Sequence, residues 1–242
     1  MASKKKYPKK GSSGSSTKWV VAAVAGVVVI AAAIAIGTSG GSSGDSAVTS
    51  TTASGAVAPG DSLPDTVKPA EYQPVKITGD ALPLMPDTGD DPGIGVKVPV
   101  VEGFNFHGDP VSLDIAASGK PTMVVFLAHW CPHCNREIPR ILELNSKGGI
   151  PEGLRVVGVA TGSRDDQANW PPSEWLAEMG WKWEKLADTQ VGDAFNAYGG
   201  QSFPTMVLVG PDGTVVNRFS GEVEVDDLGA RIKAFMEKVS KA

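Results

Sequence analysis

The C-terminal part of the chain carries two largely apolar runs, at 122–127 and 154–160, the second with Arg155 near its start. Uninterrupted runs of β-branched and aromatic residues are typical of strands that are buried on both faces of a sheet. Helical patterns follow at 172–179, 191–198 and 225–239, and the last of these is amphipathic. Because strands alternate with helices along the chain, the pattern predicts an α/β domain.

The segment after the first apolar run has the periodicity of a helix. Its apolar residues Ile138, Ile141, Leu142 and Leu144 recur at roughly the spacing of one helix face. We therefore expect the chain to pass from a buried strand into a helix at 128–134.

The N-terminal pattern is different, because the eighteen residues at 19–36 contain no charge or strong polar group. At about 1.5 Å per helical residue, this run is just long enough to cross a bilayer core of about 30 Å. Six lysines precede it and the first acidic residue is Asp45. By the positive-inside rule, residues 1–18 form a basic cytoplasmic tail and 19–36 a single-pass transmembrane signal anchor, with the rest of the chain extracytoplasmic.

A cleaved signal peptide is the alternative, because Ala33, Ile34 and Ala35 can be read as an A-x-A cleavage site. The protein would then be secreted. The apolar run exceeds the roughly 7 to 15 residues of a usual signal h-region, which favours the anchor. Residues 37–94 are rich in Gly, Ser, Thr and Pro and are expected to be a disordered linker, with the folded domain at 95–242.

The two cysteines of the chain, Cys131 and Cys134, are spaced as C-x-x-C at the expected strand-to-helix turn. The unpaired N–H groups of a helix N-terminus favour an anion, so we expect Cys131 to attack disulfides as a thiolate. Cys134, one helical turn further on, is placed to attack the resulting mixed disulfide. His133 can stabilise the thiolate by charge or by hydrogen bonding, which makes the disulfide a stronger oxidant.

A structural disulfide or a metal half-site would use the same pair of cysteines. Zinc usually takes four ligands, and haem attachment requires a histidine directly after the second cysteine, where Asn135 stands. A non-catalytic copper carrier that uses Cys131, Cys134 and His133 is a hypothesis of another class. We expect no bound metal and no cofactor besides the redox-active Cys131–Cys134 disulfide.

Residues 126–134 resemble the active-site region of the thioredoxin superfamily, and 135–139 resemble the membrane-anchored extracytoplasmic oxidoreductases of the TlpA and ResA type. The resemblance covers roughly 95–242. It implies a thioredoxin-like fold, with a central mixed sheet flanked by helices. An N-terminal β-hairpin extension would be formed by 96–101 and 111–115.

The resemblance also assigns substrate-binding residues. Residues 201–209 are similar to the cis-proline loop of the family and to the strand that follows it. This implies a cis bond before Pro204, which would lie beside the cysteines and offer backbone groups to a substrate peptide. Phe203 would line the substrate surface, and Trp130 is placed for contact because it directly precedes Cys131.

Glu137 lies three residues after Cys134, on the same face of the expected helix. In ResA-type proteins the matching glutamate is a buried acid that tunes the cysteine pair, so the resemblance implies that Glu137 carries protons for Cys134. The alternative is a solvated carboxylate on the helix surface.

Two departures from the family patterns bear on the class of thioredoxin-like protein and on the direction of the reaction. Val125 stands where thioredoxins proper carry a buried Asp, which argues against a cytosolic thioredoxin. The Pro132 and His133 dipeptide resembles that of the oxidising DsbA proteins and favours an oxidase or isomerase. The alternative is a TlpA-type or ResA-type reductase that supports cytochrome c maturation.

The charge balance narrows the class of partner. The formal net charge is −5, and setting aside the six N-terminal lysines leaves −11 for the exported part, which makes it a poor binder of nucleic acid. The expected partners are exported protein thiols or disulfides. A separate membrane or extracytoplasmic redox partner is also required, because the chain has no third cysteine to relay electrons.

Four tryptophans crowd the segment between the second apolar run and the expected cis-proline. They could form a docking surface for a partner, since Trp is enriched at interfaces, or they could pack this segment onto the sheet. The packing interpretation is favoured. The four residues are Trp170, Trp175, Trp181 and Trp183.

Overall fold

The computed structural model describes residues 55–58 and 61–241. The expected cytoplasmic tail at 1–18, the signal anchor at 19–36 and the first part of the linker lie outside these residues. Within the described part of the chain, no helix combines the length and apolar character that crossing a membrane requires.

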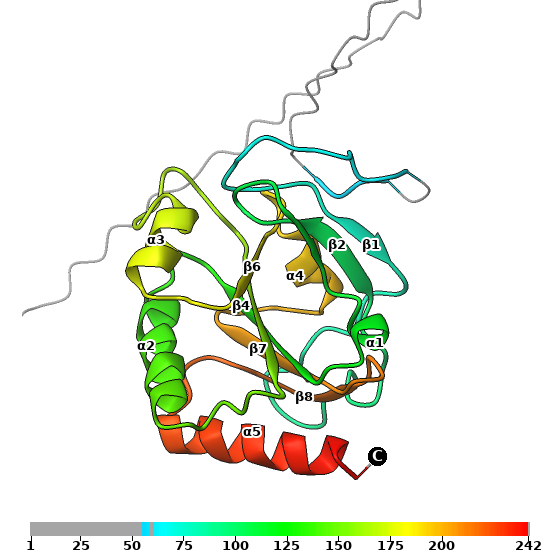
Figure 1. Ribbon diagram of the computed structural model, residues 1–242, viewed down its shortest axis with the longest axis vertical. Helices are drawn as coiled ribbons and strands as arrows, with labels where there is room; N and C mark the ends of the chain where they lie inside the picture. The colour runs from blue at the N-terminus through cyan, green and yellow to red at the C-terminus, as the bar shows by residue number, and fades with distance from the viewer. Residues whose placement is uncertain (1–54, 59–60, 242) are drawn as a thin grey trace, which may run out of the picture. The chain divides into compact units, whose positions relative to one another are not determined.

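One mixed sheet organises the domain (Figure 1). Its strand order is β1-β2-β6-β5-β4-β7-β8, with β3 paired to β2. The strands are β1 (Lys76–Thr78), β2 (Val100–Phe104), β3 (Pro110–Ser112), β4 (Thr122–Leu127), β5 (Arg155–Ala160), β6 (Glu184–Ala187), β7 (Thr205–Val209) and β8 (Val215–Ser220). β4 pairs parallel with β5 and antiparallel with β7, so the predicted mixed sheet is confirmed.

Helices pack on both faces of this sheet (Figure 1). They are α1 (Ile115–Ser118), α2 (Pro132–Ser146), α3 (Pro172–Glu178), α4 (Asp193–Ala197) and α5 (Val225–Val239). Alternate residues of β4 serve the two faces, as expected for a strand. Met123 and Val125 join the core beneath α2, α3 and α5, whereas Val124 and Phe126 join the core beneath α1 and α4. The result is a thioredoxin-like α/β fold.

The tryptophans pack this domain rather than forming one exposed surface. Trp175 and Trp181 are each only 3% exposed and belong to the core beneath α2. The Trp181 ring lies directly over Gly158 of β5, where a Cβ atom would come within 2.8 Å of the ring. For these two residues the docking interpretation is therefore wrong, because they fill the space between the sheet and the insert that contains α3.

The expected disordered linker at 37–94 is wrong for its second half. Residues 61–94 run along the domain, contribute β1 to the sheet and bury Val75, Leu82 and Met85. The side chain of Arg218 in β8 is fully buried and fixes this segment. Its Nη1 donates to the Pro83 carbonyl at 2.9 Å, and its Nε donates to Asp91 at 2.9 Å.

Periodicity could not reveal this segment, because outside the three-residue β1 it buries isolated side chains against the domain. The expected strand at 111–115 is also shorter, since β3 ends at Ser112 and α1 begins at Ile115. Asp114 caps α1 by accepting a hydrogen bond from the Ala117 N–H at 2.9 Å. Strand β6 was not anticipated from the sequence, because its four residues are too few to show a pattern.

Candidate active site

Cys131 and Cys134 lie where β4 passes into α2. Cys131 occupies the N-cap in an extended conformation, and Pro132 begins the helix. Proline suits this position because its fixed φ fits the helix and its missing N–H would have no partner there. Both cysteines are free thiols, and Cys131 is 5% exposed while Cys134 is completely buried. This is the predicted strand-to-helix placement.

The predicted substrate-binding residues gather beside Cys131. The Phe203–Pro204 bond is cis, as the resemblance implied, and the Phe203 carbonyl oxygen lies 3.7 Å from the Cys131 Sγ. The rings of Trp130 and Phe203 meet edge to face, with centroids 5.8 Å apart. Trp130 is held by a hydrogen bond of 2.8 Å from its Nε1 to the Gly162 carbonyl. Two partly buried aromatic residues that contact each other therefore adjoin Cys131, Trp130 in the sequence and Phe203 through its carbonyl.

Glu137 lies on the inner side of α2 and is completely buried. Its Oε2 accepts a hydrogen bond of 2.9 Å from the Val223 N–H, and Arg140 Nη1 approaches to 3.7 Å. Its Oε1 has no hydrogen-bond partner among the described residues. Burial raises the pKa of Glu137 above its ordinary value. The solvated-surface alternative for this residue is therefore wrong.

Cys134 shares this buried environment. Burial raises the pKa of the Cys134 thiol strongly, and the neighbouring Cys131 and Glu137 raise it further. A buried thiol with a high pKa is unreactive until a nearby base removes its proton. The free Oε1 of Glu137 is a group in this environment that could accept that proton.

His133 and Arg136 lie on the outer side of the same helical turn. The Nδ1 of His133 is 2.7 Å from Oε1 of Glu222, in the connection between β8 and α5. Arg136 donates to the same oxygen through Nε at 2.9 Å and Nη2 at 2.6 Å. Hydrogen bonds from Arg136 and His133 lower the pKa of Glu222 to about 2. The structure thus gives His133 a carboxylate partner that the sequence did not suggest.

His129 is a residue to which the sequence assigned no role. It is 1% exposed, its Nδ1 lies 2.7 Å from the Ala168 carbonyl, and its Nε2 accepts from the Arg164 N–H at 3.1 Å. Burial lowers the pKa of His129, so the neutral ring is favoured. Asn169 adds a hydrogen bond of 2.8 Å to the His129 carbonyl. The ring therefore fastens the 164–169 loop beside the active site, a long-range contact that no local motif signals.

The described residues hold no group of three or more His, Cys, Asp or Glu side chains arranged to bind a metal ion. The copper-carrier hypothesis therefore gains no support from the side-chain geometry.

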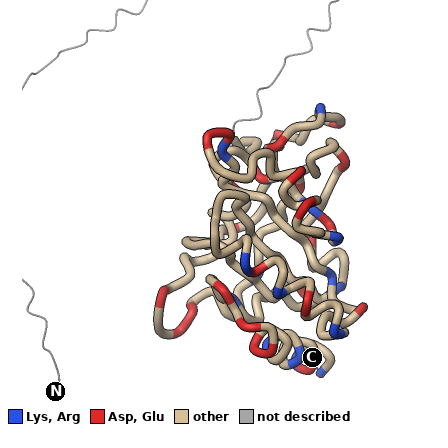
Figure 2. The backbone as a smooth tube through the Cα atoms, turned by 90° about the vertical axis from the view of Figure 1, so that its left-hand side faces the viewer, with Lys and Arg blue, Asp and Glu red and all other residues tan. Residues whose placement is uncertain are grey.

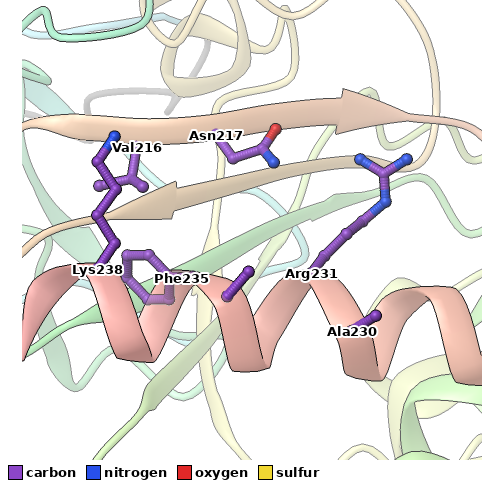
Figure 3. Close-up of a pocket in the computed structure, with 7 residues that line it drawn as sticks. Val216, Asn217, Ala230, Arg231, Phe235 and Lys238 are labelled. Atoms are coloured by element: carbon purple, nitrogen blue, oxygen red, sulfur yellow. The ribbon is translucent and has the colours of Figure 1, made fainter.

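A separate groove lies between β8 and α5 (Figure 3), where Arg231, Phe235 and Lys238 are among the lining residues. These residues supply no thiol and no acid, so we do not assign the groove to the redox site. In the view of Figure 2, basic and acidic residues are interspersed over the domain.

The thioredoxin-like sheet and the dithiol at the start of α2 define a disulfide oxidoreductase. More particularly, the chain belongs to the AhpC/TSA family, whose model matches residues 94–218.

The thiol:disulfide interchange protein DsbE of Escherichia coli K12 is 29% identical over 164 residues, which cover 63% of this chain and 82% of DsbE. The thiol:disulfide interchange protein CycY of Rhizobium leguminosarum is 30% identical over 129 residues, covering 53% and 65% of the two chains. The solution structure of a thiol:disulfide interchange protein from a Bacteroides species has 28% identity and a TM-score of 0.45. It covers 59% of this chain and 89% of that one.

Proposed function

We propose that this protein is a membrane-anchored extracytoplasmic reductase that opens disulfides in exported proteins through Cys131 and Cys134. The observation that carries the proposal is the buried acid Glu137 near the buried thiol Cys134, on the helix whose N-cap Cys131 contacts the Phe203 carbonyl. The AhpC/TSA family match and the named interchange proteins support thiol-disulfide exchange as the chemistry.

In the first step, the Cys131 thiolate attacks one sulfur of a substrate disulfide. A bond forms between Cys131 and that sulfur, the substrate disulfide breaks, and the other substrate sulfur leaves as a thiolate that takes a proton. The Phe203 carbonyl and the flanking rings of Trp130 and Phe203 are placed to hold the substrate peptide. We assign substrate contact to these two residues and to Pro204.

In the second step, Cys134 must lose its proton before it can attack Cys131. Glu137 accepts that proton, and the Cys134 thiolate attacks the Cys131 sulfur. The Cys131–Cys134 disulfide forms, and the remaining substrate sulfur leaves as a thiolate that takes a proton. The enzyme supplies both electrons and the Cys134 proton, and the solvent supplies the second proton that the reduced substrate gains. A raised pKa suits Glu137 to this role, because a base must hold and release a proton near neutral pH.

The structure gives a reason to prefer reduction over oxidation. His133 would make the disulfide a strong oxidant by stabilising the Cys131 thiolate, but its Nδ1 is directed at Glu222. The dipeptide of Pro132 and His133 still favours a second candidate, an oxidase or isomerase that introduces disulfides. The two candidates differ in reduction potential.

The cellular placement of this proposal rests on the sequence alone. The apolar run at 19–36 and the lysines before it support a catalytic domain outside the cytoplasm. The enzyme needs a separate electron donor to reduce Cys131–Cys134 again, because it has no further cysteine. Apocytochrome cysteines are one substrate class that the resemblance to TlpA-type and ResA-type proteins implies.

A trapping experiment in cells tests the exchange mechanism. The full-length Cys134→Ser variant should accumulate mixed disulfides between Cys131 and exported proteins, because the resolving thiol is gone. The matched Cys131→Ser variant should trap none. Recovery of no exported partner by Cys134→Ser, from cells in which it is folded and oxidising conditions are maintained, would contradict the proposed function.

A further inference from the structure

Glu222 forms the centre of a charged cluster on the outer side of α2. Its Oε1 receives the contacts from His133 and Arg136 described above, and its Oε2 accepts a hydrogen bond of 2.9 Å from Arg140 Nη1. No other carboxylate among the described residues lies within hydrogen-bond distance of His133. The cluster thus joins the connection between β8 and α5 to the helix that carries both cysteines.

The direction of these hydrogen bonds follows from the chemistry of the carboxylate. An ionised carboxylate only accepts hydrogen bonds, so the 2.7 Å contact with Glu222 requires a proton on the Nδ1 of His133. Arg136 Nη2 also lies 3.1 Å from this nitrogen. Arg136 directs two of its donors at Oε1 of Glu222. The polar partner found for the Cys131 Sγ is the Phe203 carbonyl, which is an acceptor and not a cation.

We propose that Glu222 is a positioning residue that restrains the oxidising power of the Cys131–Cys134 disulfide, by holding His133 and Arg136 to itself and away from the Cys131 thiolate. This inference rests on the proposed function and deepens it. It accounts for part of the way in which a chain with a histidine between its cysteines can act as a reductant, since the histidine is engaged by a carboxylate 89 residues away in the sequence.

The sign of the effect follows from the exchange reaction with glutathione. The protein disulfide and two glutathione thiols yield the protein dithiol and one glutathione disulfide. Only the dithiol form can carry negative charge on Cys131, as a thiolate, whereas the disulfide form is neutral there. A carboxylate that binds the His133 and Arg136 side chains reduces their stabilisation of a Cys131 thiolate and therefore favours the disulfide form. Its removal should favour the dithiol form.

Several other charges face the same cluster and must be separated from Glu222. Arg140 also pairs with Glu224, at 3.0 Å from Nη2, and lies 3.7 Å from the buried Glu137. The Glu224 side chain is 73% exposed and forms no hydrogen bond or ion pair with His133 or Arg136. Glu224 is therefore a matched control, because Glu224→Gln removes the same charge two residues away without releasing the two side chains.

The experiment measures the equilibrium of the full-length protein, in detergent, with reduced and oxidised glutathione. Glu222→Gln should shift the equilibrium constant toward the dithiol by about fivefold, the effect of one charge several ångströms away in a partly solvated site. This equals about 20 mV for a two-electron couple. Glu224→Gln should shift it by less than half as much.

Two further variants test the route of the effect. In a His133→Asn background, Glu222→Gln should produce a smaller shift, because part of the coupling has been removed. Glu222→Ala should shift the equilibrium in the same direction as Glu222→Gln, which guards against a variant that fails to fold. The pH profile of Cys131 alkylation should move to lower pH in both Glu222 variants, a change that a merely structural role would not produce.

An unchanged equilibrium in both Glu222 variants, or a shift toward the disulfide, would overturn the inference. An equal shift in Glu224→Gln would also overturn it, because the effect would then be one of overall charge. Failure of the wild-type protein to exchange with glutathione at all would instead overturn the proposed function, so the two failures are distinguishable.

Discussion

The two sides of the first turns of α2 differ sharply in their surroundings. On the inner side, Cys134 and Glu137 are completely buried, and burial raises the pKa of each. On the outer side, the side chains of His133 and Arg136 are more than half exposed and face Glu222. The same turns of α2 thus carry a buried acid and thiol on one side and a solvent-exposed charged cluster on the other.

This difference separates two properties that a cysteine pair must have. In the proposed mechanism, the inner side controls the rate at which the mixed disulfide is resolved, because it governs the proton of Cys134. The outer side controls the stability of the dithiol form in this proposal, because it governs the charge near Cys131. The 222–223 segment touches both sides, since the Val223 N–H binds Glu137 and the Glu222 carboxylate binds His133.

The largest expected effect comes from removing Cys131, the thiol that attacks the substrate disulfide. Cys131→Ser should reduce the turnover of a disulfide substrate to the uncatalysed rate, because no other thiol is positioned to attack. Cys134→Ser should still react once with the substrate and then stop. The measurement is single-turnover and steady-state reduction of a disulfide-bonded peptide, and multiple turnovers by Cys131→Ser would contradict the assignment.

Removal of the inner acid should have the next largest effect. Glu137→Gln should slow resolution of the mixed disulfide by about 100-fold, the low end of the range for a positioned proton acceptor. The wild-type rate should rise with pH through the raised pKa of Glu137, whereas the variant should lack that inflection. Release of a peptide thiol from a preformed mixed disulfide measures this step, and an unchanged pH profile would remove Glu137 from the mechanism.

The same acid makes a prediction for stability. A carboxyl group whose pKa is raised on folding contributes stability that is complete below its unfolded pKa of about 4.5 and is lost as pH rises through the folded pKa. The free energy of unfolding of the wild type should therefore fall relative to that of Glu137→Gln as pH rises through this window. Denaturant unfolding of the reduced proteins at several pH values gives the difference, and parallel curves would show that Glu137 ionises normally.

His129 links the buried side of the active site to the 164–169 loop, and its substitution tests this link. His129→Ala should destabilise the protein by about 2 kcal/mol, because the Ala168 carbonyl and the Arg164 N–H lose their partner. His129→Gln can donate one hydrogen bond and accept the other, so it should recover part of the loss. Denaturant unfolding with hydrogen exchange of 164–169 measures both, and identical stability of the two variants would contradict the fastening role.

The smallest expected effect is that of salt, and it distinguishes the two sides directly. Raising the ionic strength from about 0.01 M to 1 M shortens the screening length from about 30 Å to 3 Å. The shift caused by Glu222→Gln should shrink, because the outer cluster is exposed, whereas the slowing caused by Glu137→Gln should persist. Equal sensitivity of the two effects to salt would remove the distinction between the two sides.

Much of the fold was predictable because its elements carry strong local patterns. The uninterrupted apolar run of β4 and the amphipathic α5 were recognised at their observed bounds. The expectation of a disordered linker fails for 61–94. This segment is bound to the domain by a few isolated buried side chains and by hydrogen bonds from Arg218, which is distant in the sequence. Sequence periodicity identifies regular helices and strands, but it does not identify segments that pack irregularly.

The candidate site shows the same division. The spacing of Cys131 and Cys134, and the cis bond before Pro204, were anticipated from motifs. The partnership of His133 with Glu222 was not, because it joins residues 89 positions apart on two separate elements. The helical position of Glu137 does not decide whether its side chain faces the core or the solvent. The packing of the 222–223 segment decides it.

The reduction potential of the wild-type protein tests the central claim most directly. The full-length chain would be equilibrated with glutathione and its thiol state read out by alkylation. A reductase whose histidine is engaged by Glu222 should have a potential near the thioredoxin value of about −270 mV, or below it. A potential near the DsbA value of about −120 mV would contradict the account and identify the protein as a disulfide donor.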